Sequence, residues 1–348
     1  MSPPSKVPSR HPFPEMEAVR SYPLASRASL VSTADFCTVP EPPPGFGAFV
    51  DSLPDIYAGT HFKRLVERIV AARVAGRPVG LALGAHVLKV GLAPLLIDWM
   101  RRGVVQHVAL NSAGAIHDFE LATVGRTSES VDDQLPLGRF GFAEETGAGL
   151  AAAAARGLET RGAKEAAEGI GFGLGLGRLL HERKAANARL SVAAEAVRLG
   201  VGVTVHVCIG ADIVHMHPAC DGAQLGEAAL ADFRRVCGFV HGMQGGVWLN
   251  VGSAVVMPEI FLKAVSVALN LGADLSRITT ANLDMIRHYR AETNVVRRPP
   301  GEGITLVGQH ELLLPLLRAA VLAKLAEHGL GALPESERDG APSQGDRR

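Results

Sequence analysis

The chain has 348 residues, of which 47% are hydrophobic and 20% charged, so it contains enough apolar material for a large core. Its 35 basic and 35 acidic residues balance, which excludes the net field of a nucleic-acid coat or a polybasic membrane anchor. The four cysteines form no CxxC pair, which argues against a disulfide scaffold or a zinc ribbon. The opening has no apolar leader and no apolar run spans a bilayer, so we expect a soluble cytoplasmic protein with no nucleic-acid or membrane partner.

Both ends of the chain differ in composition from the middle. Eleven of the 21 prolines fall in residues 1–54, so residues 1–55 are predicted to form an extended, proline-rich arm. Residues 331–348 are polar and contain Gly and Pro, which predicts a disordered tail. The folded domain is therefore expected within residues 56–330.

Short β-rich runs alternate with longer helical patterns through this domain. We predict strands at Val79–Gly84, Val104–Asn111, Val201–Ile209, Val247–Val251 and Leu275–Thr280. We predict helices at Leu88–Arg102, Ala188–Leu199, Leu225–Val240 and Pro258–Leu271, with further helices in residues 144–199. Strands separated by helices favour βαβ crossovers, so the predicted fold class is α/β, with a mainly parallel sheet covered by helices on both faces.

The predicted strand exits carry small residues, often followed by a polar one. Ligands of parallel sheets bind beyond the carboxyl ends of the strands, where small side chains let backbone N–H groups approach a phosphate or ribose. Packing alone accounts for small residues at any single turn, but five such turns together favour a nucleotide site. The turns are Gly84-Ala85-His86, Asn111-Ser112-Ala113-Gly114, Gly210-Ala211-Asp212, Gly252-Ser253-Ala254 and Thr279-Thr280-Ala281-Asn282.

Alternating glycines occupy residues 169–177. This run never satisfies GxGxxG, so it is not the dinucleotide fingerprint. We expect it to serve close helix packing or a flexible crossover.

Histidines and carboxylates follow the third predicted strand, in VHVCIGADIVHMHPACDG. Imidazole with nearby carboxylate binds zinc or iron, which makes His206, His215, His217 and Asp221 candidate metal ligands. His215 and His217 are also candidate general bases, because neutral imidazole accepts a proton. The structural alternative is that these histidines are strand and loop residues with local hydrogen bonds. We favour a catalytic or binding role for this loop over a divalent metal site.

At these residues the chain resembles the deoxyhypusine synthase family, over roughly residues 56–330. The matching stretches are GAHVLKVGLAPLLIDWMRRGVVQHVALNSAGAIHDF, LGRFGFAEETG, VTVHVCIGADI, WLNVGSAVVMPEIF and ITTAN, in the family's order and at compatible spacing. The resemblance implies an NAD-dependent, Rossmann-like, doubly wound fold, and a homotetramer with active sites at subunit interfaces. Characterised members oxidise spermidine and pass its aminobutyl group through a lysine imine. In some members an N-terminal segment covers a neighbour's active-site entrance, which suits the proline-rich arm.

The resemblance also implies which residues bind NAD. Asp118 falls at a cofactor-contacting acid, and Asp212 at the acid expected near a cofactor ribose. His86 stands where the family has Asn. The full predicted cofactor set is Gly84, Ala85, His86, Ser112, Ala113, Gly114, Asp118, Asp212, Gly252, Ser253, Ala254, Thr280 and Ala281.

The polyamine half of the family's site is not retained. The imine-forming lysine of the family has no counterpart, because the only lysine after Lys263 is Lys324, in the predicted final helix. The corresponding region reads TNVVRRPP, and the guanidinium groups of Arg297 and Arg298 stay protonated and cannot form an imine. The family's amine-holding aspartate falls at His217. Because guanidinium suits carboxylate or phosphate, we expect an anionic or carbonyl-bearing substrate.

Several functions stay open at this point. The leading hypothesis is an NAD-dependent enzyme for a small molecule, with His215 or His217 as base, Asp118 orienting cofactor or base, and Arg297 and Arg298 at the substrate. The alternatives are a true deoxyhypusine or homospermidine synthase, a metal-dependent lyase or hydrolase, and an NAD-binding pseudoenzyme. NAD is the expected cofactor, and a divalent metal is the lesser possibility.

Overall fold

The computed structural model describes residues 45–159 and 171–338. Its six strands form one wholly parallel sheet in the order β3-β2-β1-β4-β5-β6, which confirms the predicted α/β, Rossmann-like fold class. No helix in the described ranges is both long and apolar enough to cross a membrane. The strands are β1 Val79–Leu83, β2 His107–Asn111, β3 Gly202–His206, β4 Val247–Val251, β5 Thr279–Asp284 and β6 Glu302–Val307.

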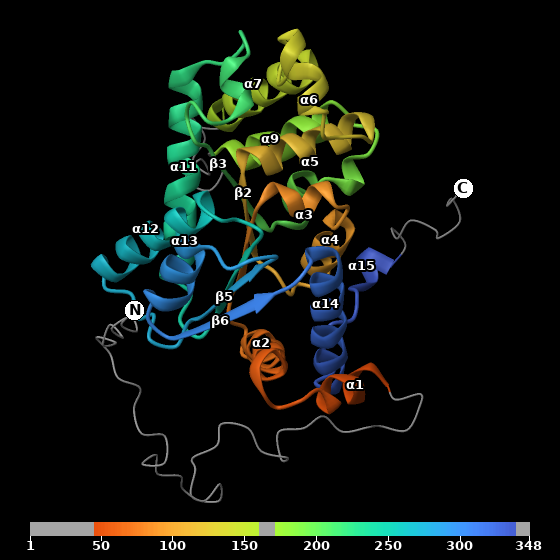
Figure 1. Ribbon diagram of the computed structural model, residues 1–348, viewed down its shortest axis with the longest axis vertical. Helices are drawn as coiled ribbons and strands as arrows, with labels where there is room; N and C mark the ends of the chain where they lie inside the picture. The colour runs from red at the N-terminus through yellow and green to blue at the C-terminus, as the bar shows by residue number, and fades with distance from the viewer. Residues whose placement is uncertain (1–44, 160–170, 339–348) are drawn as a thin grey trace, which may run out of the picture.

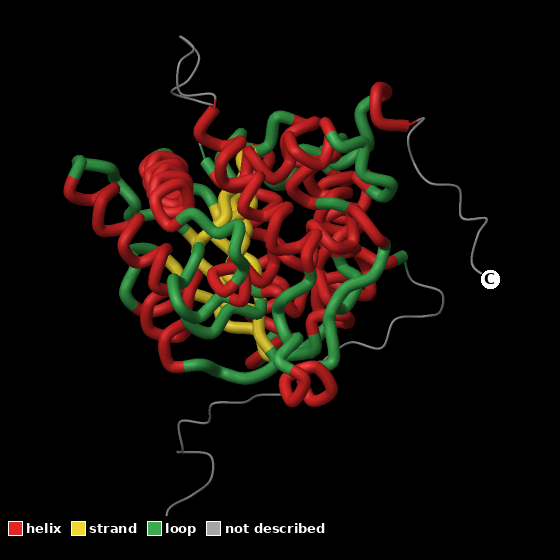
Figure 2. The backbone as a smooth tube through the Cα atoms, turned by 90° about the horizontal axis from the view of Figure 1, so that it is seen from above, coloured by secondary structure: helices red, strands yellow, loops and turns green. Residues whose placement is uncertain are grey.

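Helices cover both faces of the sheet, so the strands lie between two helical layers (Figure 2). In Figure 1, α11 and α12 lie on one side of the strands, and α4 and α14 on the other. The longer helices are α2 Tyr57–Val74, α4 Ala93–Arg101, α5 Ser112–Val124, α7 Glu144–Glu159, α9 Phe172–Glu182, α10 Val192–Leu199, α11 Gly222–His241, α12 Val256–Asn270 and α14 His310–Glu327. The short ones are α1 Phe46–Ser52, α3 Ala85–Lys89, α6 Val131–Gln134, η4 Leu135–Leu137, η6 Ala188–Leu190, η7 Ile213–Met216, α13 Tyr289–Ala291, η8 Glu292–Arg297 and α15 Glu335–Arg338.

Successive strand residues point to opposite faces and therefore build two separate cores. In β1, Leu81 and Leu83 pack into the core shared with α2, α4 and α14, whereas Ala82 packs into the core under α11 and α12. In β4, Leu249 belongs to the first core and Trp248 to the second. Every residue of these two strands is buried, as expected for central strands of a parallel sheet.

Trp248 dominates the core under α11 and α12. Its ring stacks on Phe261 of α12 at 4.7 Å between centroids and an interplanar angle of 9°. Gly80 on the paired strand β1 leaves room for it, because a Cβ there would lie 2.8 Å from Trp248 and 2.7 Å from Phe239. A large aromatic and a glycine thus share one layer of the core.

The glycine run packs helices closely, as predicted, at its described positions. A Cβ on Gly173 would lie 2.5 Å from the carbonyl oxygen of β3 residue Val203. A Cβ on Gly175 would lie 2.1 Å from a carbonyl oxygen of α7, and one on Gly177 2.4 Å from a carbonyl oxygen of α10. Gly169 lies outside the described residues. The glycines of α9 therefore let this helix contact its neighbours backbone to backbone.

The structure corrects the predicted fifth strand and adds a sixth. The fifth strand was expected at Leu275–Thr280, but β5 begins at Thr279 and ends at Asp284. Its polar TTANLD sequence resembles a loop, yet all six residues are buried and the Asn282 side chain pairs with that of Asn250 at 2.8 Å. The sixth strand, β6, was not predicted.

Three further expectations change in detail. The predicted helix Leu88–Arg102 is two helices, α3 and α4, separated by a turn in which Gly91 has φ +81°. Helix α1 lies inside the segment predicted as an extended arm, of which residues 1–44 are outside the described ranges. Within the predicted disordered tail, Glu337 of α15 is buried and pairs with Arg198 at 2.6 Å. Helix α15 therefore contacts the folded body through Glu337.

Candidate functional site

A cavity of about 240 Å³ lies beyond the carboxyl ends of β2 and β3. One face of α5 forms its floor, because Ser112, Ile116 and Glu120 recur at helical spacing and all line it. The loop that follows β3 supplies Asp212 to the opposite wall, and Glu129 lies in the segment that follows α5. Three of the predicted cofactor residues, Ser112, Ala113 and Asp212, therefore meet in one cavity.

The N-terminus of α5 forms one end of this cavity. Asn111 caps the helix, and its Oδ1 accepts the N–H of Gly114 at 2.8 Å. The 13-residue helix therefore begins directly after β2 and directs its unpaired N–H groups and positive dipole end beyond the sheet edge. Ser112 is 1% exposed, and its hydroxyl has no hydrogen-bond partner among the described residues. A buried, unpaired hydroxyl at a helix N-terminus suits an anionic ligand group.

Asp212 holds the loop that closes the other side. Its Oδ2 accepts the N–H of Cys208 at 2.6 Å, which fixes the turn that carries Gly210, where φ is +87°. The other carboxylate oxygen, Oδ1, accepts no hydrogen bond from a described residue, and the side chain lines the cavity. A carboxylate in this position can accept hydrogen bonds from a ribose diol or an ammonium group.

Acidic side chains and one histidine make up the charged lining of the cavity. Asp212, Glu120 and Glu129 contribute carboxylates, and no described lysine or arginine lines it. His117 is half-buried, and burial lowers its pKa below the usual value, with Lys89 acting in the same direction and Glu120 in the opposite one. The imidazole is therefore neutral at neutral pH. Sequence reasoning missed His117, although its position one turn before Glu120 on α5 is a helical-face signal.

The glycines of the β1 and β4 exits serve packing. A Cβ on Gly84 would lie 1.9 Å from the carbonyl oxygen of Gly252, so the two strand exits touch backbone to backbone. Gly252 has φ +66°, and a Cβ there would lie 2.9 Å from His310. Ser253 is buried and its hydroxyl accepts the N–H of Met257 at 3.3 Å. Neighbouring protein atoms therefore explain the small residues of these turns without a ligand.

Next to these turns lies a cluster of titratable residues that was not predicted. His310 is fully buried, and its Nε2 lies 3.4 Å from the carbonyl oxygen of Leu283 and 3.9 Å from Asp284. The ring of His86 lies 5.5 Å from that of His310, so this predicted cofactor residue contacts the cluster. Burial lowers the pKa of His310, while Asp284 acts in the opposite direction.

Of the predicted positions, Thr280 and Ala281 lie in a strand, whereas Ala254 lies in the turn after β4. Thr280 and Ala281 lie inside β5 and are buried, because the strand continues to Asp284. They are therefore not at the exit of β5, which is where the sequence placed them. Ala85 and Ala254 are half-buried at the exits of β1 and β4, and neither lines the α5 cavity.

Asp118 has a different role from the one predicted. Its carboxylate accepts the hydroxyl of Ser191 at 2.6 Å and the N–H groups of Val192 and Ala193 at 2.6 and 3.1 Å. Burial raises its pKa to about 6, against the lowering effect of these three donors. Asp118 therefore caps the start of α10 and stands outside the cavity.

The predicted metal ligands do not converge. Nδ1 of His215 accepts the N–H of Gly210 at 3.2 Å, and Nδ1 of His217 accepts the N–H of Ala219 at 3.1 Å. His206 is buried at the end of β3, where burial lowers its pKa to about 3, and Asp221 caps α11. The described residues contain no group of three or more His, Cys, Asp or Glu side chains placed to hold a metal.

The arginines assigned to the substrate are held by their own segment. Arg297 donates to the Thr293 hydroxyl at 2.7 Å, and Arg298 donates to the Asn294 side chain at 2.8 Å. Arg297 is the last residue of the π-helix η8, and Arg298 follows it directly. Neither residue lines the α5 cavity. Like these arginines, His215 and His217 do not line the α5 cavity, although the N–H of His215 donates to the carbonyl oxygen of Asp212 at 3.2 Å.

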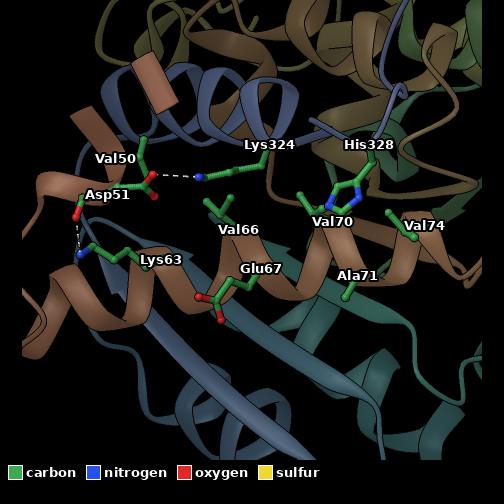
Figure 3. A pocket seen from close by; sticks show the side chains of 10 residues that line it. All are labelled: Val50, Asp51, Lys63, Val66, Glu67, Val70, Ala71, Val74, Lys324 and His328. Atoms are coloured by element: carbon green, nitrogen blue, oxygen red, sulfur yellow. Dashed lines mark hydrogen bonds and ion pairs between the residues drawn. The ribbon is translucent and has the colours of Figure 1, made fainter. Parts of the chain in front are cut away.

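A second, larger cavity of about 530 Å³ lies between α1, α2 and α14 (Figure 3). Val66 and Val70 of α2 line its apolar part, and Lys324 of α14 points to Asp51, 2.9 Å away. Lys63 donates to the backbone oxygen of Asp51 at 3.0 Å. Its lysines are thus already paired, and it lies away from the strand exits that form the α5 cavity.

Comparison with known proteins gives similarity of fold at low identity. No protein-family model and no curated protein matches the chain. AgrE, solved as a ternary complex with ornithine and NAD⁺, is 16% identical with a TM-score of 0.46, over 78% of this chain and 34% of AgrE. A protein assigned to the LOR/SDH group, from Methanococcus maripaludis S2, is 13% identical with a TM-score of 0.45, over 90% of this chain and 76% of that one.

A protein assigned as a deoxyhypusine synthase, from Entamoeba histolytica, is 9% identical with a TM-score of 0.45. That likeness covers 81% of this chain and 94% of the other. The chain spans about a third of the length of AgrE and of the cyanobacterial arginine dihydrolase ArgZ. These likenesses concern the fold alone.

Proposed function

We propose that this chain is an NAD-dependent enzyme that oxidises a small amine- or hydroxyl-bearing molecule in the α5 cavity. The observation that carries the proposal is the meeting of Ser112 and Asp212 in this one cavity. Ser112 lies at the capped N-terminus of α5, and its buried hydroxyl is unpaired. Asp212 supplies a carboxylate from the loop after the neighbouring strand β3. A phosphate and a ribose require these two kinds of group at neighbouring strand ends.

The residues present fit NAD at both of these groups. The N-terminal N–H groups of α5 and the Ser112 hydroxyl would hold the diphosphate, and Asp212 would accept hydrogen bonds from a ribose diol. When bound, the cofactor would accept the hydride of the substrate, which carries both electrons. The chain's own residues orient the substrate and take up its proton.

The lining of the cavity changes the expected substrate class. Glu120 lies about two turns along α5 from Ser112, and with Glu129 it favours an ammonium or hydroxyl group on the substrate. A substrate anion at that end of the cavity would meet these carboxylates and no described guanidinium, whereas the diphosphate of the cofactor would lie at the helix N-terminus. This replaces the anionic substrate suggested by Arg297 and Arg298. Imine chemistry is disfavoured at the one lysine that follows Lys263, because Asp51 raises the pKa of Lys324 and keeps it protonated.

We also propose that the chain forms homo-oligomers through the carboxyl edge of the sheet. Large apolar side chains are exposed at or shortly after the carboxyl ends of four strands, and exposed apolar groups of this kind are typical of a subunit interface. Light scattering should show a mass above that of one chain, and Ile286→Glu with Tyr289→Ala should lower it. The exposed residues are Ile209, Val255, Ile286, Tyr289, Val307 and Leu312.

Calorimetric titration with NAD⁺ tests the proposed function. Micromolar affinity corresponds to about 8 kcal/mol, so a real site gives a clear signal. Ser112→Ala and Asp212→Asn each remove about 1.5–3 kcal/mol of hydrogen bonding to a charged group, which weakens binding roughly 10- to 100-fold. Asp221→Asn is the matched control, because Asp221 caps α11 and its replacement keeps an acceptor. Absence of binding at millimolar NAD⁺, or equal loss in the control, would contradict the proposal.

A further inference from the structure

A continuous chain of hydrogen bonds runs behind the α5 cavity. Nδ1 of His117 lies 2.6 Å from the hydroxyl oxygen of Thr127, and that hydroxyl donates to Oε2 of Glu120 at 2.6 Å. The hydroxyl of Thr146 donates to Oε1 of the same carboxylate at 2.9 Å. Both carboxylate oxygens therefore accept a hydroxyl proton, and one of the two donors also contacts the imidazole.

This chain fixes the tautomer of His117. A threonine hydroxyl has one proton, and that of Thr127 is directed to the acceptor-only carboxylate of Glu120. The hydroxyl oxygen must then accept from the imidazole, so the ring proton of His117 is on Nδ1. Nε2 consequently keeps its lone pair, and no described residue donates to it. The ring lines the cavity next to Ser112 and Asp212.

We infer that His117 is the proton acceptor of the site, with Glu120, Thr127 and Thr146 as the positioning residues that fix its tautomer. This inference rests on the proposed function and deepens it. In other enzymes a carboxylate fixes the orientation of a catalytic histidine, and here the hydroxyl of Thr127 and the carboxylate of Glu120 would do the same for His117. It replaces the prediction that His215 or His217 is the base.

The step that follows is balanced for an alcohol or an amine. The C–H bond of the substrate breaks and its electron pair leaves with the hydrogen as hydride to a nicotinamide oxidant. The O–H or N–H proton passes to Nε2 of His117, and a C=O or C=N bond forms. The charged and titratable groups around the imidazole are Glu120 on α5, Lys89 on α3, and Glu129 and Asp212 across the cavity.

Acylation by diethyl pyrocarbonate, followed by mass spectrometry of the full chain, measures whether Nε2 is a free nucleophile. His117 should react in the wild type, with the exposed His61 as a reactive reference and the buried His107 as an unreactive one. Thr127→Val should lower the acylation rate of His117 several-fold, because the tautomer with its proton on Nε2, which has no lone pair there, becomes populated. Thr127→Ser keeps the hydroxyl and should react like the wild type.

Neutron diffraction on a deuterium-exchanged crystal provides a second readout. Deuterium on Nδ1 of His117 and none on Nε2 supports the inference, and deuterium on Nε2 overturns it, as does equal acylation in Thr127→Val and Thr127→Ser. Added NAD⁺ should protect His117 from acylation. A free Nε2 without NAD⁺ binding overturns the proposed function alone, whereas NAD⁺ binding with a protonated, unreactive Nε2 overturns the inference alone.

Discussion

Replacement of Asp118 tests whether this carboxylate holds the start of α10 or a cofactor. Asp118→Ala leaves the Ser191 hydroxyl and the N–H groups of Val192 and Ala193 unpaired in a buried site, at about 1–3 kcal/mol each. Burial of the charged carboxylate raises the pKa of Asp118 from 3.8 to about 6, which corresponds to a cost of about 3 kcal/mol in the wild type at pH 7. The alanine variant does not have this cost, so it offsets part of the loss. The three unpaired groups together cost about 3–9 kcal/mol, so the free energy of unfolding should fall by up to about 6 kcal/mol.

The pH dependence gives an independent check through Asp118→Asn. Because the native pKa of Asp118 lies above the unfolded value, its stabilising contribution is complete below about pH 4 and is lost as the pH rises through about 6. Relative to Asp118→Asn, the wild type should lose about 2 kcal/mol of stability between pH 4 and pH 7 in urea unfolding. The capping role would be refuted if Asp118→Ala kept the stability of the wild type but lost NAD⁺ binding completely.

Four other replacements test packing and buried charges elsewhere in the fold. Burial raises the pKa of Asp232 to about 7, so Asp232→Asn should gain about 4 kcal/mol relative to the wild type as the pH rises from 4 to 8; a constant difference would contradict this. Gly84→Ala should cost about 3 kcal/mol or more, because its Cβ meets backbone, whereas Gly226→Ala in α11, with open space around it, should stabilise by up to about 1 kcal/mol. Glu195→Gln should cost about 3–5 kcal/mol, because this buried carboxylate pairs with Arg198 at 2.7 Å, and a loss below 1 kcal/mol in thermal unfolding would exclude a structural ion pair.

Hydrophobic pattern predicted the central part of the fold. β1 and β4 are fully buried on both faces, so their sequences VGLAL and VWLNV are apolar apart from Asn250, with turns on either side. β5 was misplaced because its buried polar side chains find partners on neighbouring strands, which a sequence pattern does not show: Asn282 pairs with Asn250 of β4, and Thr280 donates to the carbonyl oxygen of Glu302 in β6. β6 lies at the edge, where only Ile304 and Leu306 face the first core, so its apolar signal is short.

The candidate site was partly predictable for the same physical reasons. Ser112 and Asp212 follow strands directly, and adjacent parallel strands place their exits at one edge. The role of Asp118 depends on a helix that starts 73 residues later, with Ser191, so no local pattern reveals it. The chain from His117 to Glu120 requires Thr127, which comes after α5 has ended and has no helical register with either residue.

A crystal structure of the full chain with NAD⁺ tests the central claim most directly. The account predicts the diphosphate against the Ser112 hydroxyl and the first N–H groups of α5, with a ribose diol within hydrogen-bond distance of Asp212. NAD⁺ bound between α2 and α14, beside Lys324, or beside His86 and His310 with the α5 cavity empty, would contradict it.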